Sequence, residues 1–556
     1  MKIVRTLTLA GLVGATALLG APLAAAGVER NPVAAAADQS TAAPRLGDDT
    51  RTVPAAQERA EKLGLTPTSE SIRTMAALSG THSIYVSVVD VIPSTTMPAN
   101  QSFNANLDQA SVTNAVAAID SFWSEQSAGA VRFQLGGYES RSLSATSCDP
   151  DAVFDSQQGA AFGGRFDRGA WVGTSEHLLT LTVEKSACRN GAGFGTLGGD
   201  GGLIFSASGI DSAVGIPVLF HEYGHNLGLN HANSAVCRSS SIDASSGNYQ
   251  YVSGAPGTNG VIATSVRCPV EEYGDVLDIM GYTVSNSAPH ASSVERYALG
   301  WLPAIKPAVA AKTTVVLRPL GDATGSRAVR VTDPRSGAVY FVEYRTPAGR
   351  DAASSEFSNT RAGTYYRGAT YTGDYTLAFA SGDAASGIVR ILRPLKLESG
   401  APSASTVLGV TPMSSNGRVR LDSLGVGDSF TTSGGGTKIS VSAMGPAAGA
   451  TISITTKQYA SKTAIKPAHS SIKRNTNSRL AITVTSIGTK KPAGKVSVYA
   501  KGKALKGYTL SSSKGGRITV TLPKFSKKGS YPLTVKYSGS TLVAGSTSAA
   551  KTVTVR

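Results

Sequence analysis

One stretch decides the fold: His221-Glu222-Tyr223-Gly224-His225-Asn226-Leu227-Gly228-Leu229-Asn230-His231, which matches the pattern H-E-x-x-H-x-x-G-x-x-H at every fixed position. Three of the chain's seven histidines fall within it. His221 and His225 are four residues apart, so on a helix both imidazoles project from one face and can bind one cation. Gly228 can take a positive φ and end the helix, which lets His231 approach that cation from another direction.

This stretch predicts a catalytic zinc site. Three neutral imidazoles with one open position are the ligand set of catalytic zinc, whereas structural zinc sites are closed. Glu222 follows the first ligand, where its carboxylate can reach a water at the metal and act as a general base. The alternative is a chance match on a histidine-bearing surface helix, because short motifs do recur by chance. A chance match that also includes Gly228 and His231 is much rarer than a chance match to the five-residue pattern H-E-x-x-H alone.

A methionine downstream extends the pattern. Asp278-Ile279-Met280-Gly281-Tyr282 places Met280 in a candidate tight turn beneath the ligands, which is the second half of the same signature. The chain has only six methionines, so one at this place is informative. Taken alone, Met280 would more often be an ordinary core residue.

On these motifs, the segment from about Ser79 to Pro303 resembles the metzincin clan of zinc peptidases, and within it the gametolysin-type group. The second resemblance also rests on Glu272-Tyr273-Gly274-Asp275 before the methionine and on Leu299-Gly300-Trp301-Leu302 after it. It implies an α+β catalytic domain with an upper mixed sheet and a lower, less regular subdomain. Reprolysin-like relatives carry an acidic residue where this chain has Ala232, which argues against that branch.

The resemblance implies a secreted zinc-dependent endopeptidase and assigns roles by motif position. One Zn2+ would be held by His221, His225 and His231. Glu222 would be the general base, and Met280 the residue of the Met-turn. If His231 is not a ligand, Glu272 or Asp275 would complete the site. The sequence leaves a calcium requirement open.

Tyr282 lies two residues after the methionine. Some relatives use a tyrosine there as a fifth ligand or to stabilise the transition state. We expect the second role, with an ordinary core tyrosine as the alternative. The resemblance also implies that the strand before the metal helix is a sheet edge that pairs with substrate. Residues Gly202 to Ser206 would then line the cleft.

Hydrophobic periodicity predicts the elements around the motif. We expect strands at Ile84–Val89, Val131–Leu135, Leu178–Val183 and Leu203–Phe205. Helical spacing between Val112 and Trp123 predicts a long amphipathic helix. Pro217 suits the first turn of the metal helix, which we expect from about Ile216 to Leu227.

The N-terminus predicts export. Lys2 and Arg5 precede an apolar run that ends in Ala24-Ala25-Ala26, so residues 1–26 are typical of a secretory signal peptide. An uncleaved membrane anchor is the alternative. Residues 27–78 are rich in Ala, Pro and polar residues and are typical of a pro-segment or a disordered spacer. Leu46-Gly47-Asp48 faintly resembles the motif through which astacin pro-segments place an aspartate on the metal, although Arg45 stands where an aromatic residue is expected.

The cysteine count fits an exported protein. Four cysteines in such a chain suggest two disulfides, and three pairings are open. We favour the two local pairs, in which each disulfide joins two consecutive cysteines of the chain. The alternative is that the cysteines are free buried thiols. The pairs are Cys148–Cys188 and Cys237–Cys268.

Two β-rich regions follow the catalytic region, which we place at 79–305. Short alternating runs between 312 and 456 predict a β-sandwich. Residues 461–556 contain 19 Lys and Arg and no Asp or Glu. Their strand spacing and the turn Tyr537-Ser538-Gly539-Ser540 resemble bacterial Ig-like domains. An all-basic domain suggests an anionic partner, such as wall teichoic acid or acidic polysaccharide. The alternative is a charged spacer that aids solubility.

Two functions therefore compete. The first is peptide hydrolysis by an extracellular or wall-associated enzyme acting on protein or peptide substrates. The second is a secreted binding protein or adhesin that keeps the peptidase fold without turnover. The intact Glu222 favours the first, because loss of that carboxylate is the simplest route to inactivity. No nucleic-acid-binding motif is present.

Overall fold

The computed structural model describes most of the chain beyond residue 77. The described residues are 50–51, 78–93, 107–145, 150–182, 193–207, 210, 215–237, 242–251, 267–281, 288–354, 357, 376–378, 384–395, 404–410 and 419–556.

A mixed six-stranded sheet forms the N-terminal part. Its order is β1-β5-β6-β4-β2-β3. Strands β6, β4, β2 and β3 are parallel to one another, whereas β5 and β1, which are parallel to each other, run in the opposite direction. Every strand expected here from the sequence is present. The strands are β1 (Thr50–Arg51), β2 (Gly80–Pro93), β3 (Val131–Ala145), β4 (Glu176–Thr182), β5 (Gly193–Thr196) and β6 (Gly202–Ser206).

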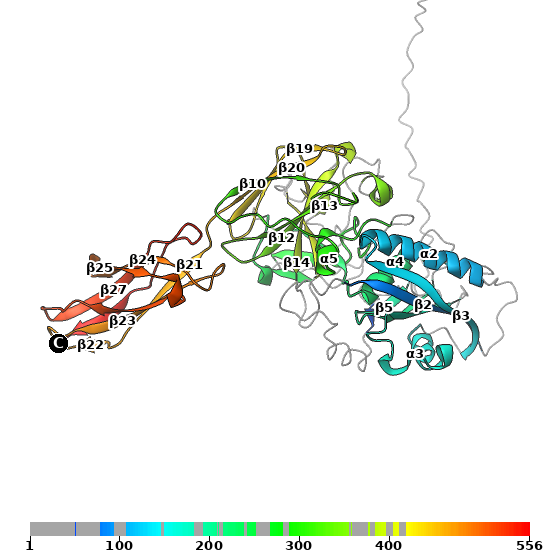
Figure 1. The fold of residues 1–556 in the computed structure, drawn as a ribbon, viewed down its shortest axis with the longest axis horizontal. Helices are drawn as coiled ribbons and strands as arrows, with labels where there is room; N and C mark the ends of the chain where they lie inside the picture. The colour runs from blue at the N-terminus through cyan, green and yellow to red at the C-terminus, as the bar shows by residue number, and fades with distance from the viewer. Residues whose placement is uncertain are drawn as a thin grey trace, which may run out of the picture. The chain divides into compact units, whose positions relative to one another are not determined.

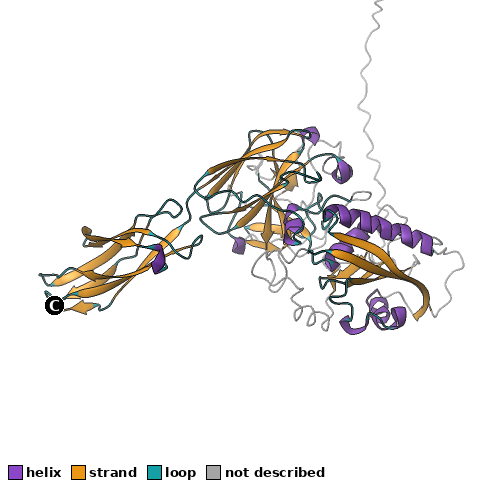
Figure 2. Cartoon of the chain, in the orientation of Figure 1, coloured by secondary structure: helices purple, strands orange, loops and turns teal. Residues whose placement is uncertain are grey.

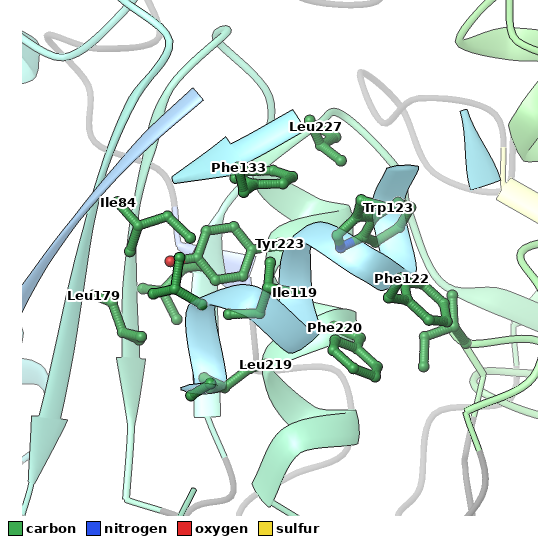
Figure 3. Close-up of a cluster of buried hydrophobic side chains, with 14 of the residues drawn as sticks. Ile84, Ile119, Phe122, Trp123, Phe133, Leu179, Leu219, Phe220, Tyr223 and Leu227 are labelled. Atoms are coloured by element: carbon green, nitrogen blue, oxygen red, sulfur yellow. The ribbon is translucent and has the colours of Figure 1, made fainter. Parts of the chain in front are cut away.

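Helices cover both faces of this sheet (Figure 1). The expected long helix is α2 (Gln109–Gln126), which begins where the Asp108 carboxylate accepts a hydrogen bond from the amide of Ser111. It packs on one face together with α4 (Gly215–Asn226), and α3 (Pro150–Ala160) packs on the other. Figure 3 shows the core on the first face, where side chains of α2 and α4 such as Phe122, Phe220 and Tyr223 meet Ile84 and Leu179 of the sheet.

The prediction that β6 is a sheet edge is wrong. The strand is hydrogen-bonded to β4 on one side and to β5 on the other. The strand that follows β6 in the sheet is β5, a short glycine-rich segment whose outer edge pairs with β1. Gly202 to Ser206 are buried throughout and cannot offer a free edge to a peptide.

A second sheet joins the histidine region to the strands beyond residue 312. Its order is β11-β12-β14-β15-β7-β9-β8, with β17 beside β14, and β15 pairs in parallel with β7. The boundary predicted between 305 and 312 therefore does not separate two independent domains. The strands are β7 (Ala232–Ala235), β8 (Tyr249–Tyr251), β9 (Cys268–Glu271), β11 (Ala328–Thr332), β12 (Val339–Arg345), β14 (Ile388–Leu395), β15 (Ala404–Leu408) and β17 (Ser423–Leu424).

The expected strands between 312 and 456 are present and share one core with this sheet. A four-stranded sheet in the order β10-β20-β19-β18 contributes side chains such as Leu317 and Ile452 to a cluster that also contains Val270 and Val342. Its strands are β10 (Lys312–Leu317), β18 (Ser429–Thr431), β19 (Thr437–Gly445) and β20 (Gly449–Thr456). A small pair is formed by β13 (Thr376–Ala378) and β16 (Val419–Leu421), and α5 (Ser293–Ala298) precedes β10 in the chain.

The C-terminal domain, residues 461–556, is a sandwich of two sheets without an α-helix (Figure 2). One sheet has the order β21-β23-β26, and the other β22-β29-β27-β24-β25 with β28 beside β27. The strands are β21 (Ser461–Pro467), β22 (Ser471–Ile472), β23 (Ser478–Ser486), β24 (Gly494–Ala500), β25 (Lys503–Leu510), β26 (Arg517–Leu522), β27 (Gly529–Tyr537), β28 (Ser546–Thr547) and β29 (Lys551–Val555).

Candidate metal centre

The helix α4 carries the first two histidines and ends as the sequence predicts. Pro217 stands in its first turn, where a missing N–H leaves no intrahelical bond unmade. Gly228 has a φ of +94°, and its amide donates to the carbonyl of His225 at 2.8 Å. The amide of Leu229 donates back to Gly224 at 2.9 Å. This left-handed turn reverses the chain after the helix and brings His231 back toward it.

The three motif histidines form one buried group. One ring nitrogen of each lies within 4.8 Å of the others, a spacing that could hold a metal ion. The ring centroids of His221 and His225 are 4.7 Å apart, and those of His225 and His231 are 4.9 Å apart. All three rings are at least nine-tenths buried. It is the one such group among the residues that the structure describes.

Each of these rings is held through Nδ1. The Nδ1 of His221 lies 2.9 Å from the carbonyl of Ile279, and that of His225 lies 2.9 Å from the carbonyl of Leu229. Because a carbonyl only accepts, both rings carry the proton on Nδ1 and the lone pair on Nε2. The Nδ1 of His231 lies 2.6 Å from Oε1 of Glu272. Such outer partners orient histidines that bind metal.

Glu272 therefore lies behind a histidine and not at the ligand position. Its carboxylate contacts Nδ1 of His231, on the side of the ring away from Nε2. Asp275 is engaged by Arg390 instead. The sequence alternative in which Glu272 or Asp275 replaces His231 as a ligand has no support in this arrangement.

Glu222 lies beside the histidines and against strand β5. Its side chain is buried, with only 2 % of the residue exposed. A Cβ added at Gly193 would lie 3.1 Å from its Oε1, and one at Gly195 would lie 3.3 Å from its Oε2. The glycines of β5 thus leave the space that the carboxylate occupies. This strand was not predicted from the sequence. The pattern Gly-x-Gly-x-Gly at 191–195 was the available signal, because glycines in a strand often mark a backbone that another group approaches closely.

Met280 lies under the metal helix. It is fully buried, and a Cβ at Gly224 of α4 would lie 2.3 Å from its sulfur, so the thioether fills the space that this glycine leaves. The carbonyl of Met280 accepts the amide of Ala232, the residue after the third histidine, at 2.8 Å. The turn at Met280 is therefore tied directly to the segment that carries His231.

Tyr273 is a site residue that the sequence reasoning quoted without giving it a role. Its ring centroid lies 3.9 Å from that of His231 and 5.9 Å from that of His221. Its φ is +57°, a conformation that is uncommon for a bulky residue. The strained backbone keeps the ring packed against two of the three histidines. No sequence pattern signals such a φ at a tyrosine.

A buried ionic network on strands β12 and β14 of the second sheet supports the turn. Arg390 of β14 binds Asp275 and, at 3.3 Å, Glu343 of β12. Arg345 of β12 donates to the carbonyl of Leu277 at 2.7 Å and pairs with Asp351. Both arginine side chains are completely buried. Residues 275–277, just before Met280, are thus anchored by strands that lie more than sixty residues downstream.

Two carboxyl groups in the same region, those of Asp278 and Glu295, interact with each other and both accept the amide of Ser292. Asp278 accepts the amide of Met280 at 2.9 Å, and Glu295 caps helix α5 from within the same buried region. Burial, followed by the charge of Asp275, raises the pKa of Asp278 to about 7. Burial, followed by the charge of Asp278, also raises the pKa of Glu295. Their mutual repulsion favours the protonated form of one of the two carboxyl groups.

A second pair of histidines fixes the end of the metal helix. Nδ1 of His82 lies 2.9 Å from Nε2 of His177, whose Nδ1 lies 3.0 Å from Oδ1 of Asn226, the last residue of α4. The amide nitrogen of Asn226 donates to Thr196 of β5 at 2.9 Å. Burial lowers the pKa of His177 to about 3, and burial also lowers the pKa of His82. Both rings are neutral at pH 7 and connect α4 to three strands.

One of the expected disulfides is present. Cys237, two residues after β7, is bonded to Cys268 of β9, which closes the segment between them. The other predicted site residues, Tyr282 and the pair Cys148 and Cys188, lie outside the described residues, as does Asp48.

Comparison with known proteins recognises the C-terminal domain. Residues 463–556 match the family described as bacterial Ig-like domain, group 3. No curated protein matches the chain. Together with the disulfide, the Ig-like match is consistent with an extracellular protein. Among the described helices, none combines the length and the apolar character that crossing a membrane requires. The match does not reach the histidine cluster.

Proposed function

We propose that this protein is a zinc-dependent endopeptidase that hydrolyses peptide bonds with Glu222 as general base. The observation that carries the proposal is the anchoring of three clustered histidines through Nδ1, with Glu222 next to the first of them. One ring nitrogen from each histidine lies within 4.8 Å of the others, as the ligands of a single metal ion would. The resemblance to metzincin peptidases in the motif and at Met280 points to the same chemistry.

The residues present fit zinc better than calcium or magnesium. Neutral imidazoles suit zinc, whereas calcium and magnesium take oxygen ligands. No carboxylate belongs to the metal-binding group, so an oxygen-seeking ion has no match there among the described residues. When bound, zinc would polarise a carbonyl and make water acidic enough to ionise near neutral pH. The cluster then supplies three ligands and leaves room for a reactant, as catalytic sites do.

The chain's own part in the reaction falls to Glu222. Its carboxylate takes a proton from the attacking water and gives it to the amine that leaves. The C–N bond breaks, and the hydroxyl that remains of the water becomes part of the new carboxyl group. Its proton, the second of the water, stays on that group until the acid ionises in neutral solution. Burial of the carboxylate beside β5 keeps it in place and limits competing water.

Strand β5 favours a polypeptide as the substrate. Its outer edge already pairs with an extended segment of the same chain, Thr50–Arg51, opposite Gly195 and Thr196. An extended peptide in the same place would form main-chain hydrogen bonds to β5 and bring its backbone beside Glu222. This assigns to β5 the part that the sequence resemblance gave to β6.

The test is hydrolysis of casein by the purified chain, with N-terminal processing verified by sequencing. We expect turnover that a zinc chelator abolishes and that added zinc restores. His231→Ala should lower the zinc content measured by elemental analysis. The competing function, a binding protein without turnover, predicts zinc-loaded protein that leaves casein intact. Turnover that survives complete removal of metal would overturn the proposal.

A further inference from the structure

The sheet β21-β23-β26 of the C-terminal domain has an outer face made only of cations and short side chains. Alternate residues along its strands are buried in the core, and the others point outward. The outward positions hold four cations, with alanine or threonine at every other place. The cations are Lys462, Lys466, Arg479 and Arg517, all of them exposed.

The strand register arranges these four cations in a ladder. Lys462 lies opposite Thr485, and Arg517 lies opposite Thr483 in the next outward row. Lys466 occupies the third row, opposite Ala481, and Arg479 the fourth, opposite Thr521. Each row therefore carries one positive charge. Successive rows are two residues apart, or about 6.7 Å, so the ladder extends over roughly 20 Å.

Nothing within the domain neutralises this ladder. Residues 461–556 contain no Asp or Glu, and all of them are described. Charges fixed in a row on a rigid sheet attract an anion more strongly when its own charges follow the same line. The face also has no aromatic side chain, and the threonines offer only short hydroxyl donors. It therefore lacks the stacking platform on which single-stranded nucleic acids are bound.

We infer that this face binds a linear polyanion whose phosphate or carboxylate groups recur along an extended chain. The rigid rows set the spacing of the charges, and the small alanine and threonine side chains let the polymer lie flat between them. A chain of polyol phosphates and a polyuronate both have this chemistry. Binding of such a polymer would hold the enzyme at an anionic surface, whatever reaction the histidine region performs.

The test uses the full chain and two variants of equal net charge. The face variant carries Lys462→Gln, Lys466→Gln, Arg479→Gln and Arg517→Gln. The matched control neutralises four exposed lysines elsewhere on the domain: Lys495→Gln, Lys503→Gln, Lys506→Gln and Lys551→Gln. Binding to immobilised poly(glycerol phosphate) and to polygalacturonate is measured between 50 and 200 mM salt, since each lost phosphate contact lowers the salt slope by about 0.7–0.9.

We expect the face variant to bind at least about tenfold more weakly, with a salt slope lower by roughly 3, and the control to stay within about threefold of wild type. The two polymers separate phosphate from carboxylate as the preferred anion. Equal losses in the two variants would show that only total charge matters and would overturn the inference. Tighter binding to duplex DNA or to anionic vesicles than to either polymer would overturn the choice of partner.

Folding of each variant is verified by thermal unfolding. If the fourfold variant is not folded, the pairs Lys462→Gln with Lys466→Gln and Arg479→Gln with Arg517→Gln replace it. Each pair should show about half of the loss in salt slope. A pair that folds and binds like wild type would contradict the ladder.

Discussion

The region around the histidines and the C-terminal domain bury different kinds of side chain. Around the histidines, charged groups such as Arg345, Arg390 and Glu343 are completely buried and paired with one another. In residues 461–556, described throughout, the buried polar residues are Thr463, Ser478 and Ser548, and none is charged. The C-terminal domain folds by apolar packing and keeps its charges in water. The fold of the histidine region depends on specific pairs of buried charged groups. The role of each charged group follows only from the geometry of its pair.

The largest contrast is expected from removing one arginine in each region. Arg390→Met leaves Asp275 buried without its cation, whereas Glu343 keeps its pair with Arg345. Breaking a buried pair in this way costs about 3–5 kcal/mol. Arg517→Met changes an exposed strand position of the C-terminal domain and should stay within about 0.5 kcal/mol. Urea unfolding, followed separately in the two regions, measures both. Equal stability of the two variants would contradict the contrast.

Removal of the disulfide should affect the histidine region alone. The bond Cys237–Cys268 closes a separation of 31 residues, and the loop-entropy estimate for that length is about 3–4 kcal/mol. Because the C-terminal domain contains no cysteine, its own unfolding transition should not move. The double variant Cys237→Ala with Cys268→Ala, compared with wild type by calorimetry, checks this. A shift in both transitions would show that the two regions unfold as one unit.

Acid should weaken the histidine region selectively. The folded-state pKa values of His82 and His177 lie below the value of about 6.5 in an unfolded chain. The folded state therefore binds fewer protons, so their contribution is complete above pH 6.5 and is lost as the pH falls toward 3. The expected slope is about 1 kcal/mol per pH unit between pH 6 and 5. The C-terminal domain has no buried histidine and should show no such slope.

A variant separates this effect from the protonation of other groups. The His82→Gln, His177→Gln protein, saturated with zinc, should show a flatter dependence of unfolding free energy on pH, whatever its absolute stability. The polar and titratable groups that face the pair are Asp200, Asn226 and Tyr223. An unchanged slope would assign the acid sensitivity to other residues.

The smallest effect is expected from deleting the C-terminal domain. Removal of Ser461 to Arg556 leaves every contact around the histidines in place. Hydrolysis of a small peptide should be unchanged, whereas retention on acidic polymer at low salt should fall. Peptide kinetics and polymer retention on the same two preparations make the measurement. Equal retention of both forms would indicate that the positive charge of this domain only aids solubility.

The sequence predicted what depends on local spacing. The positions of His221 and His225 on one helix, the turn at Gly228 and the strands of the C-terminal domain follow from periods and turn chemistry within a few residues. The disulfide Cys237–Cys268 was also a local pair. Each of these features depends on residues that are close in the sequence. The local backbone geometry therefore determines their relative positions.

Contacts between distant segments were missed. The pairing of β7 with β15 joins residues 232–235 to 404–408, and no pattern in either strand specifies the other. Arg390 and Arg393 stand in an apolar strand and were given no role, although charged residues within such a run signal buried partners. The edge of the first sheet was wrongly assigned because β5 has four residues, two of them glycine, and gives no periodic signal.

The central claim is that the three histidines and Glu222 form a hydrolytic zinc centre. The most direct test is to measure kcat and zinc content together in wild type and in Glu222→Ala. The account predicts one zinc per chain in both proteins, because Glu222 is not a ligand, and a loss in kcat of about 10²–10⁴-fold or more, because the general base is gone. A clean Glu222→Ala preparation that retains its zinc and hydrolyses peptides at the wild-type rate would contradict it.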